Sequence, residues 1–237
     1  MTVNDAVIHE TLERLNAEFE NSTPQEILHW AVQNYGQSLV SVTSFQPTGI
    51  VILHMLSEIA PNTPVLTLDT GLLFPETYAL MEQLEQQLNL NLIRVRPALT
   101  VERQAEQYGA ALWERDPDRC CDLRKTVPLA QALTPYSAWI TGLRRDQSEG
   151  RGQTPIISWD RKHEKVKLAP LATWNESMVW MYLEAFELPH NALHDQGYPS
   201  IGCYPCTQAV SPDSSDKRAG RWRGHRKTEC GIHVINR

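Results

Sequence analysis

The chain has 237 residues, 41% of them apolar, and a formal net charge of −6 at pH 7. This length is enough to bury a substantial core in one domain, and the acidic balance argues against general nucleic-acid binding. No run approaches the roughly 18 apolar residues of a membrane span, and the first residues lack the features of a secretion signal. We therefore expect a soluble, cytoplasmic protein without a membrane partner, whose thiols act as ligands or catalysts rather than forming disulfides.

Two helices are predicted within residues 1–36. Apolar residues recur at helical spacing between Val7 and Phe19, and Thr23 with Glu26 forms a capping box with a proline at the first helical position. Gly36 is a typical helix stop. We expect these helices to support a core that begins at residue 37.

Strands and helices then alternate up to residue 199. Residue patterns predict strands over 39–43, 65–68, 92–95 and 138–141, with helices between them. Repeated β-α units indicate an α/β fold with a doubly wound, mostly parallel sheet. Residues 150–165 are expected to form an exposed loop or a small hairpin, residues 166–170 an edge strand, and Thr173 with Glu176 the capping box of a further helix.

Small and polar residues follow three of these strands. Ser44 follows the first strand, Asp69 to Gly71 the second, and Gly142 to Arg145 the strand that ends near residue 141. Ligands of such sheets bind beyond the carboxyl ends of the strands, and a helix that starts after a short loop presents N–H groups to a phosphate. The pattern is common to α/β proteins, so on its own it indicates only where a ligand would bind.

Four cysteines form two close pairs. Cys203 and Cys206 have the C-x-x-C spacing of a metal or cluster site, and Cys120 and Cys121 are adjacent near the start of a helix that Asp118 is expected to cap. Adjacent helical residues point about 100° apart, which favours a large four-iron cluster over a single zinc ion. A zinc site and simple burial of the thiols both remain open.

The fifth cysteine, Cys230, lies in a basic segment. Residues 216–237 carry seven Lys/Arg against two Asp/Glu, a local charge of +5 that leaves −11 for the rest of the chain. Nearby cations increase the thiolate fraction of a cysteine, as an activated nucleophile requires. The alternative is a surface thiol in a solvated basic tail. A product held covalently on one thiol would need an external dithiol to release it.

Several cations suit the binding of a small anion. Arg218 and Arg221 are three residues apart, and Arg144 and Arg145 follow a strand, all able to bind phosphate or sulfate oxygens. Lys125 lies one helical turn from Cys121, where its charge would stabilise an anionic cluster or substrate. Each cation alone is equally consistent with surface charge, but together with Cys230 they predict an anion site beside a nucleophile.

Taken together, these motifs resemble those of the assimilatory adenylyl-sulfate / phosphoadenylyl-sulfate reductases. The resemblance covers most of the chain and is carried by Ser44-Phe45, Leu68-Asp69-Thr70-Gly71, Cys120-Cys121, Thr141 to Ser148, Cys203-x-x-Cys206 and Glu229-Cys230-Gly231-Ile232-His233. It implies an adenine-nucleotide α-hydrolase-like fold. The segments expected are N-terminal helices at 1–36, a nucleotide-binding core at 37–199 and a cysteine-bearing, irregular segment at 200–237.

The resemblance also implies a reaction. Cys230 would attack the sulfur of the activated sulfate to form an S-sulfocysteine, and thioredoxin or glutaredoxin would release sulfite for cysteine biosynthesis. The implied substrate-binding residues are Ser44, Asp69, Thr70, Gly71, Lys125, Gly142, Arg144, Arg218, Arg221 and His233. The implied ligands of one [4Fe-4S] cluster per subunit are Cys120, Cys121, Cys203 and Cys206.

Two alternatives to this reading stay open. The four paired cysteines match the branch that uses adenylyl sulfate, but a phosphoadenylyl-sulfate reductase would work by the same mechanism. A zinc-stapled regulatory module, in which Cys230 is incidental, belongs to another functional class. Gln46 and Pro47 stand where the family often has a glycine, and proline removes an N–H donor from the phosphate loop. The chain has no fused thioredoxin-like domain, so the reductant is expected to be a separate protein, and a homo-oligomer is possible.

Overall fold

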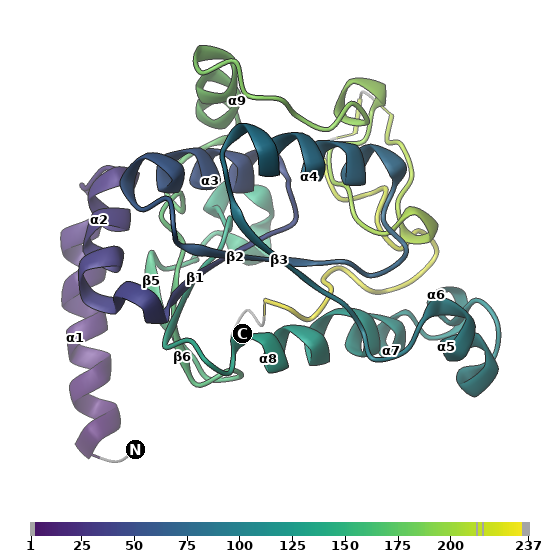
Figure 1. Ribbon diagram of the computed structural model, residues 1–237, viewed down its shortest axis with the longest axis horizontal. Helices are drawn as coiled ribbons and strands as arrows, with labels where there is room; N and C mark the ends of the chain where they lie inside the picture. The colour runs from purple at the N-terminus through teal and green to yellow at the C-terminus, as the bar shows by residue number, and fades with distance from the viewer. Residues whose placement is uncertain (1–2, 212, 215, 234–237) are drawn as a thin grey trace.

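The computed structural model describes residues 3–211, 213–214 and 216–233, and within these it contains a six-stranded sheet of order β3-β2-β1-β4-β6-β5 (Figure 1). The pairs of neighbouring strands are parallel apart from β5 and β6, which run antiparallel. The strands are β1 (Leu39–Thr43), β2 (Pro64–Leu68), β3 (Asn91–Val95), β4 (Ala138–Ile140), β5 (Ile157–Asp160) and β6 (Lys165–Leu168). The predicted mostly parallel sheet is confirmed.

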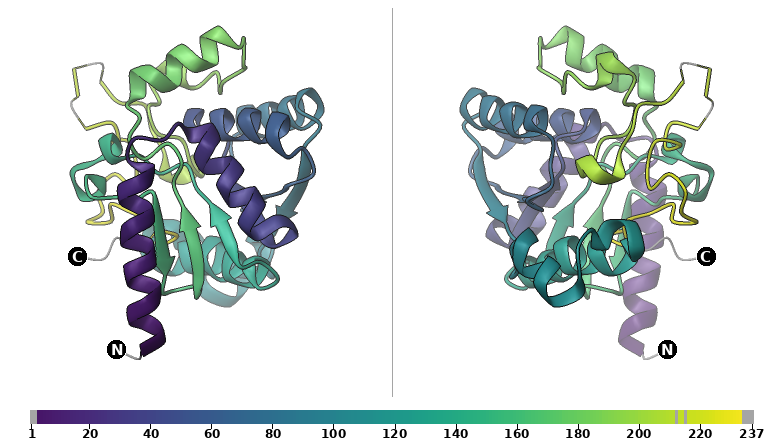
Figure 2. Two further views of the ribbon diagram at one scale, coloured as in Figure 1. Left: turned by 90° about the vertical axis from the view of Figure 1, so that its left-hand side faces the viewer. Right: turned by 90° about the vertical axis from the view of Figure 1, so that its right-hand side faces the viewer.

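The two N-terminal helices, α1 (Val3–Phe19) and α2 (Pro24–Tyr35), lie where the sequence predicts them. Thr23 and Glu26 form the expected capping box, in which the backbone N–H of each donates to the side chain of the other. Gly36, with φ of +50°, ends α2 in a conformation that glycine adopts at little cost. Helix α1 packs beside β5 at the edge of the sheet (Figure 2).

Helices cover both faces of the sheet. On one face lie α3 (Pro47–Ile59) and α4 (Pro75–Gln87), with α9 (Glu176–Ala185) packed on α3; α8 (Val127–Leu133) lies on the other (Figure 1). Side chains alternate between the two faces along a strand. Ala138 and Ile140 of β4 therefore belong to the hydrophobic core on the side of α3, whereas Trp139 packs against α8 on the opposite face. The sheet is therefore doubly wound.

The first cysteine pair ends a short helix. After α5 (Val101–Tyr108) and α6 (Leu112–Arg115), helix α7 spans Pro117–Cys121 and continues through a π-helical turn, Asp122–Thr126, into α8. The prediction that Asp118 caps this helix is wrong: Asp116 accepts the N–H of Arg119. Pro117 suits the first helical position, so the capping residue has to precede it.

Two other sequence predictions need correction. Strand β6 is not an edge strand, because β5, which the sequence analysis placed in an exposed loop or small hairpin, pairs with its outer side. Helix α9 starts after Asn175, which accepts the N–H of Met178, and not at a Thr173 capping box. The chain is still turning at Thr173, since Trp174 N–H donates to the carbonyl of Leu171.

In its described part, the segment after residue 199 is irregular, as predicted. It contains a short 3-10 turn at Tyr204–Cys206 and isolated bridges that pair Leu73 with Cys203 and Thr207 with Arg221. The segment, green to yellow in Figure 1, crosses the carboxyl ends of the strands. Arg237, which contributes to the basic tail, lies outside the described residues. Within the described part of the chain, no helix has the length and apolar character to cross a membrane.

Candidate active site

A large cavity lies where the order of the strands reverses. From β1 the chain proceeds outward through β2 and β3 on one side, whereas β4 and β6 lie on the other side of β1. A crevice is expected at such a switch point, beyond the carboxyl ends of the strands. The loops after β1 and β4 both line a cavity of about 500 Å³ there. The cavity thus lies beyond the carboxyl ends of the strands, where the sequence analysis expects a ligand.

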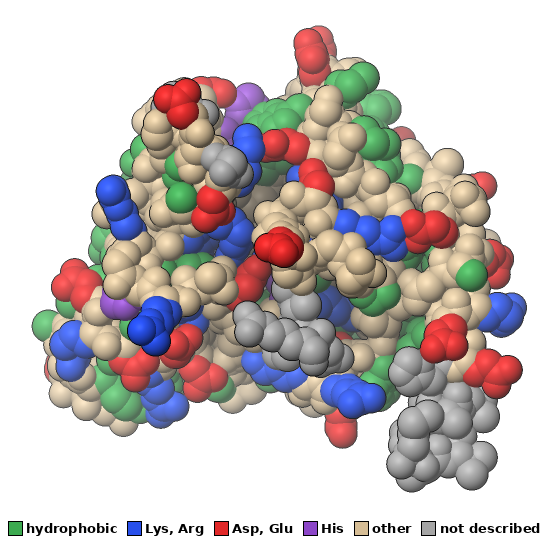
Figure 3. Space-filling view, turned by 180° about the vertical axis from the view of Figure 1, so that it is seen from behind, with side chains coloured by type: hydrophobic (Ala, Val, Ile, Leu, Met, Phe, Trp, Pro, Cys, Tyr) green, Lys and Arg blue, Asp and Glu red, His purple; other side chains and the backbone are tan. Residues whose placement is uncertain are grey.

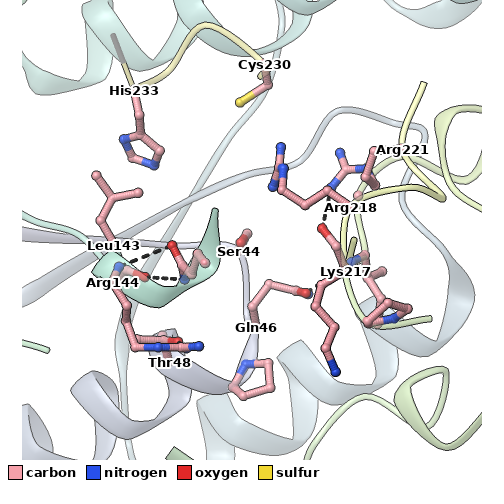
Figure 4. Close-up of a pocket in the computed structure, with 18 of the residues that line it drawn as sticks. Ser44, Gln46, Thr48, Leu143, Arg144, Lys217, Arg218, Arg221, Cys230 and His233 are labelled. Carbon is pink, nitrogen blue, oxygen red and sulfur yellow. Dashed lines mark hydrogen bonds between the residues drawn. The ribbon is translucent and has the colours of Figure 1, made fainter. Parts of the chain in front are cut away.

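The loop after β1 is tightly turned and joins the cavity to helix α3. The hydroxyl of Thr43 accepts the N–H of Phe45, whose φ is +53°. Pro47 stands at the first position of α3, where its missing N–H would have no partner within the helix. Ser44 and Gln46 line the cavity (Figure 4), and the amide oxygen of Gln46 accepts the N–H of Ile201. Gln46 thus ties this loop to the cysteine-bearing segment.

Gly142 and Arg144 form the opposite wall. A Cβ at Gly142 would lie 3.3 Å from the backbone nitrogen of Gly49, so the loop packs tightly against the start of α3 at this position. Arg144 is held by two bonds to Asp146 at 2.8 and 3.2 Å and by the hydroxyl of Thr48, which fixes its guanidinium in the cavity wall. Arg145 does not share this position, because it pairs with Glu20 of α1.

The loop after β2 contributes one polar side chain, that of Thr70, and one apolar side chain, that of Leu73, to the cavity. Thr70 lines it, whereas Asp69 and Gly71 are not among the described residues that do. Although burial opposes the shift, hydrogen bonds from Tyr78, the N–H of Gly71 and Arg96 hold the pKa of Asp69 below its usual range. The Asp69 carboxylate therefore stabilises the loop in which it lies. A φ of +69° at Gly71 completes the turn.

A second, small cavity is lined by all four paired cysteines. Its other lining residues are Leu72, Trp113, Pro117, Arg124 and Lys125. The Thr70 hydroxyl lies 3.3 Å from Cys203 Sγ, and the Gln104 amide donates to Cys120 Sγ at 3.8 Å. Among the described residues, no group of three or more His, Cys, Asp or Glu side chains has the arrangement of a single-ion metal site.

Burial opposes the ionisation of three of these thiols, those of Cys120, Cys121 and Cys206. It raises the pKa of Cys120 and of Cys121, and together with the neighbouring Cys203 it raises the pKa of Cys206 to about 12. A positively charged metal centre is what converts such thiols into thiolate ligands. Two pairs of cysteines on one partly apolar cavity, with two cations beside them, are a donor set that fits an iron-sulfur cluster.

Lys125 lines both cavities. Burial disfavours the charged form of Lys125 and by itself would lower its pKa. The nearby sulfurs of Cys203, Cys121 and Cys230 have a larger effect in the opposite direction, so the pKa of Lys125 lies above its ordinary value. Lys125 thus lies near Cys121, as predicted, and also reaches the cavity that Cys230 lines.

Cys230 lies in the wall of the large cavity, and its sulfur points into it (Figure 4). The preceding residue, Glu229, is held by Arg151 through bonds of 3.0 and 2.7 Å and by Arg218 at 3.2 Å. Arg151 was not predicted as a site residue, because its segment was expected to form an exposed loop or a small hairpin; its side chain is only 8% exposed. Nothing local in the sequence links these two residues, which are 78 positions apart.

Three cations surround one indole ring. Arg221, Lys227 and Arg218 lie 4.6, 5.5 and 5.8 Å from the ring centre of Trp222. Trp222 is buried, lines the cavity, and was not recognised from the sequence, which identified the two arginines alone. The space-filling view shows basic side chains gathered around a hollow in this face of the molecule (Figure 3). The indole face holds these cations together by cation–π contacts.

His233 also lines the cavity, on the side of Leu143 (Figure 4). Its ring stacks on Trp139 with a centroid distance of 5.8 Å and an interplanar angle of 9°. Burial, with Lys167 and Arg151 among the nearby cations, holds the pKa of His233 well below its ordinary value. The imidazole is therefore neutral, which suits a stacked or hydrogen-bonding role rather than that of a fixed cation.

Comparison with known families identifies the chain. Residues 38–209, which include the strands, both cysteine pairs and the loops around the cavity, match the family model described as the phosphoadenosine phosphosulfate reductase domain. The chain belongs to this reductase family. The match ends before Cys230, so the tail that carries this thiol lies beyond the region that the model covers.

Similar proteins extend the likeness over the whole chain. An adenosine 5'-phosphosulfate reductase of Salinibacter ruber is 50% identical over 94% of this chain and 88% of its own length. A phosphoadenosine 5'-phosphosulfate reductase of Gloeobacter violaceus is 46% identical over 94% of each chain. The crystal structure of a phosphoadenylyl-sulfate reductase of Candida auris, in a phosphate complex, superposes with a TM-score of 0.76 at 31% identity, covering 85% of this chain and 97% of that one. The predicted family and fold are confirmed.

Proposed function

We propose that this protein is an adenylyl-sulfate reductase, which converts adenylyl sulfate to sulfite and AMP through an S-sulfocysteine on Cys230, for assimilatory sulfate reduction. The observation that carries the proposal is the position of the Cys230 sulfur in a cation-lined cavity at the switch point of a nucleotide-binding sheet. Relatives named adenosine 5'-phosphosulfate reductase, 44–50% identical over most of the chain, support the choice of reaction.

In the first step, the Cys230 thiolate forms a bond to the sulfur of adenylyl sulfate. The bond between that sulfur and the bridging phosphate oxygen breaks, and AMP leaves with the electron pair. Charge that develops on the leaving phosphate and on the sulfonate oxygens would be stabilised by Lys125, Arg218 and Arg221, which line the cavity. Proximity and fixed charge are what the site contributes to this step.

Other lining residues are proposed to hold the nucleotide. Ser44 and the N-terminus of α3 would bind the phosphate, since free N–H groups at a helix start favour an anion. The loop that contains Thr70 would lie along the base and ribose, with Gly142 and Arg144 opposite. Asp69 and Gly71 would act through the shape and backbone of this loop.

In the second step, a dithiol protein reduces the adduct. One of its thiolates attacks Cys230 Sγ and expels sulfite, and its second thiol resolves the mixed disulfide and restores the Cys230 thiol. The dithiol is oxidised to a disulfide and the sulfonate is reduced to sulfite, so the electrons balance. We propose thioredoxin or glutaredoxin as this separate partner, and the cytoplasm as the compartment.

We further propose that Cys120, Cys121, Cys203 and Cys206 hold one [4Fe-4S] cluster, since they line one cavity. When bound, such a cluster supplies a fixed charge beside the cavity and, in general, a redox centre. The chain itself contributes the buried cations: Arg124 donates to the carbonyl of Thr70 at 2.6 Å, and Lys125 extends to the substrate cavity. These residues orient the wall that the nucleotide would contact.

The 3'-phosphorylated nucleotide is the alternative substrate. The Gloeobacter violaceus relative, named a phosphoadenosine 5'-phosphosulfate reductase, is nearly as similar as those named for adenylyl sulfate. Both nucleotides would react by the same two steps, so the alternative changes the substrate and not the chemistry.

The experiment is sulfite release by anaerobically purified protein with thioredoxin, comparing the two nucleotides and recording the iron content and visible spectrum. We expect preference for adenylyl sulfate and about four irons per chain. Preference for the 3'-phosphorylated nucleotide would favour the alternative substrate. Absence of turnover with both, together with one zinc per chain, would refute the enzyme and favour a regulatory module.

A further inference from the structure

The hairpin formed by β5 and β6 reaches the tail that carries Cys230. Lys162, in the turn between the two strands, donates to the carbonyl of Gly231 at 2.9 Å. Asp160 holds this turn, because its carboxylate accepts the N–H of Lys162 at 3.1 Å and contacts the His163 ring at 2.7 Å. Lys162 therefore projects from an ordered turn and contacts Gly231, the residue that follows Cys230.

The same hairpin helps to form the surface on which the His233 ring packs, which we call the Trp139 seat. Trp139 of β4 is fully buried, and Lys167 of β6 lies 5.0 Å from its ring centre. The His163 ring meets the indole edge-on at 5.9 Å, and the His233 ring stacks on it at 5.8 Å. The seat is formed from two neighbouring strands and one turn, and it receives a residue three positions after Cys230.

We propose that the β5–β6 hairpin is a positioning element for the nucleophile: Lys162 and the Trp139 seat dock the chain after Cys230 and so hold its sulfur against the activated sulfate. This inference rests on the proposed reductase function. The tail is already held before Cys230 by the Arg151–Glu229 pair. Docking on both sides of the nucleophile fixes its direction, which attachment on one side does not.

The contacts that dock the chain after Cys230 can break reversibly. Lys162 is exposed, so water competes for the hydrogen bond that it donates to the carbonyl of Gly231. A reductant must reach Cys230 after the adduct forms, so a strongly held tail would obstruct the second step. Docking by the hairpin therefore favours adduct formation and opposes discharge.

The test compares Lys162→Met with Lys162→Arg and with Arg161→Met, a neighbouring exposed cation in the same turn. The anaerobic full-length holoenzyme is mixed with adenylyl sulfate, and S-sulfonation of Cys230 is followed by intact-protein mass spectrometry. Loss of one hydrogen bond from a charged donor at an exposed position should slow adduct formation about three- to fivefold. We expect Lys162→Arg to restore the rate and Arg161→Met to leave it unchanged.

Two further measurements separate docking from folding and from the reaction itself. Discharge of the preformed adduct by thioredoxin should be unchanged or faster in Lys162→Met, which a damaged fold would not produce. Alkylation of Cys230 by iodoacetamide in the nucleotide-free protein should be faster by a similar factor. Equal alkylation of the Lys162→Met and Arg161→Met variants would overturn the docking role, even if the wild type formed no adduct and the proposed reaction itself failed.

Discussion

Replacing Glu229 by glutamine tests whether the ion pairs beside Cys230 position the nucleophile. The carboxylate accepts two bonds from Arg151, at 3.0 and 2.7 Å, and one from Arg218 at 3.2 Å. The three side chains are only 23%, 8% and 19% exposed, respectively. An amide of the same shape keeps one acceptor oxygen but leaves two guanidinium groups without an opposing charge.

The size of the effect follows from these contacts. A hydrogen bond to a charged group contributes about 1.5–3 kcal/mol when its partner is buried, and the partial exposure of Glu229 favours the lower end. Each 1.4 kcal/mol corresponds to about a factor of ten in an equilibrium constant or a rate. We therefore expect Glu229→Gln to slow formation of the S-sulfocysteine about tenfold, because fewer molecules hold Cys230 in the cavity wall.

The assay is a single turnover of the anaerobic holoenzyme with excess adenylyl sulfate, quenched and analysed by mass spectrometry. Glu149→Gln, the same change at an exposed carboxylate in the turn that ends at Arg151, is the matched control and should behave like the wild type. If Glu229→Gln and Glu149→Gln react at the same rate, the ion pairs do not position the nucleophile, and the argument built on Arg151 fails.

Four further outcomes are expected. Cys230→Ser should abolish sulfite release while adenylyl sulfate still binds in equilibrium dialysis; loss of binding as well would assign the residue a structural role. Cys203→Ser should lose iron and the brown colour in metal analysis and visible spectra, and a full iron content would remove it from the ligand set. Gly220→Ala should lower both the melting temperature and activity, because a Cβ there would lie 2.1 Å from the carbonyl oxygen of Gln208; an unchanged variant would contradict this packing. Burial lowers the pKa of Lys167 from 10.5 to about 8, so between these pH values the unfolded chain binds more protons than the folded chain. The free energy of unfolding, measured in urea, should therefore rise from pH 8 to pH 10 relative to that of Lys167→Met. Parallel pH dependences for the two proteins would refute the shift.

Local patterns predicted most of the strands well, for identifiable reasons. The β-branched run at residues 39–43 and the capping box at Thr23 act within a few residues, so the sequence alone carries them. The position of β5 outside β6 depends on a hairpin that closes the sheet edge, which no local pattern encodes. Likewise, the Lys162 contact to Gly231 joins positions 69 residues apart.

The direction of side chains in the binding loops was also beyond the sequence. Asp69 and Thr70 are neighbours after the same strand, yet Thr70 lines the cavity while Asp69 is held by Tyr78 and Arg96. Which of two adjacent polar residues faces a ligand depends on the turn that follows and on partners from other strands. The resemblance to a family identifies the loop. The three-dimensional structure is needed to tell which of its residues lines the cavity and which stabilises the backbone.

The two cavities share a wall, and this links the paired cysteines to the chemistry at Cys230. Thr70 lines the large cavity, its hydroxyl contacts Cys203 Sγ, and its carbonyl is held by Arg124. Lys125 lines both cavities. In the proposed reaction, a change at the paired cysteines would reach the substrate cavity through Thr70 and Lys125. A cluster held by these cysteines would then act as a rigid, charged part of the proposed substrate site, without any need for an electron to pass between the two sites.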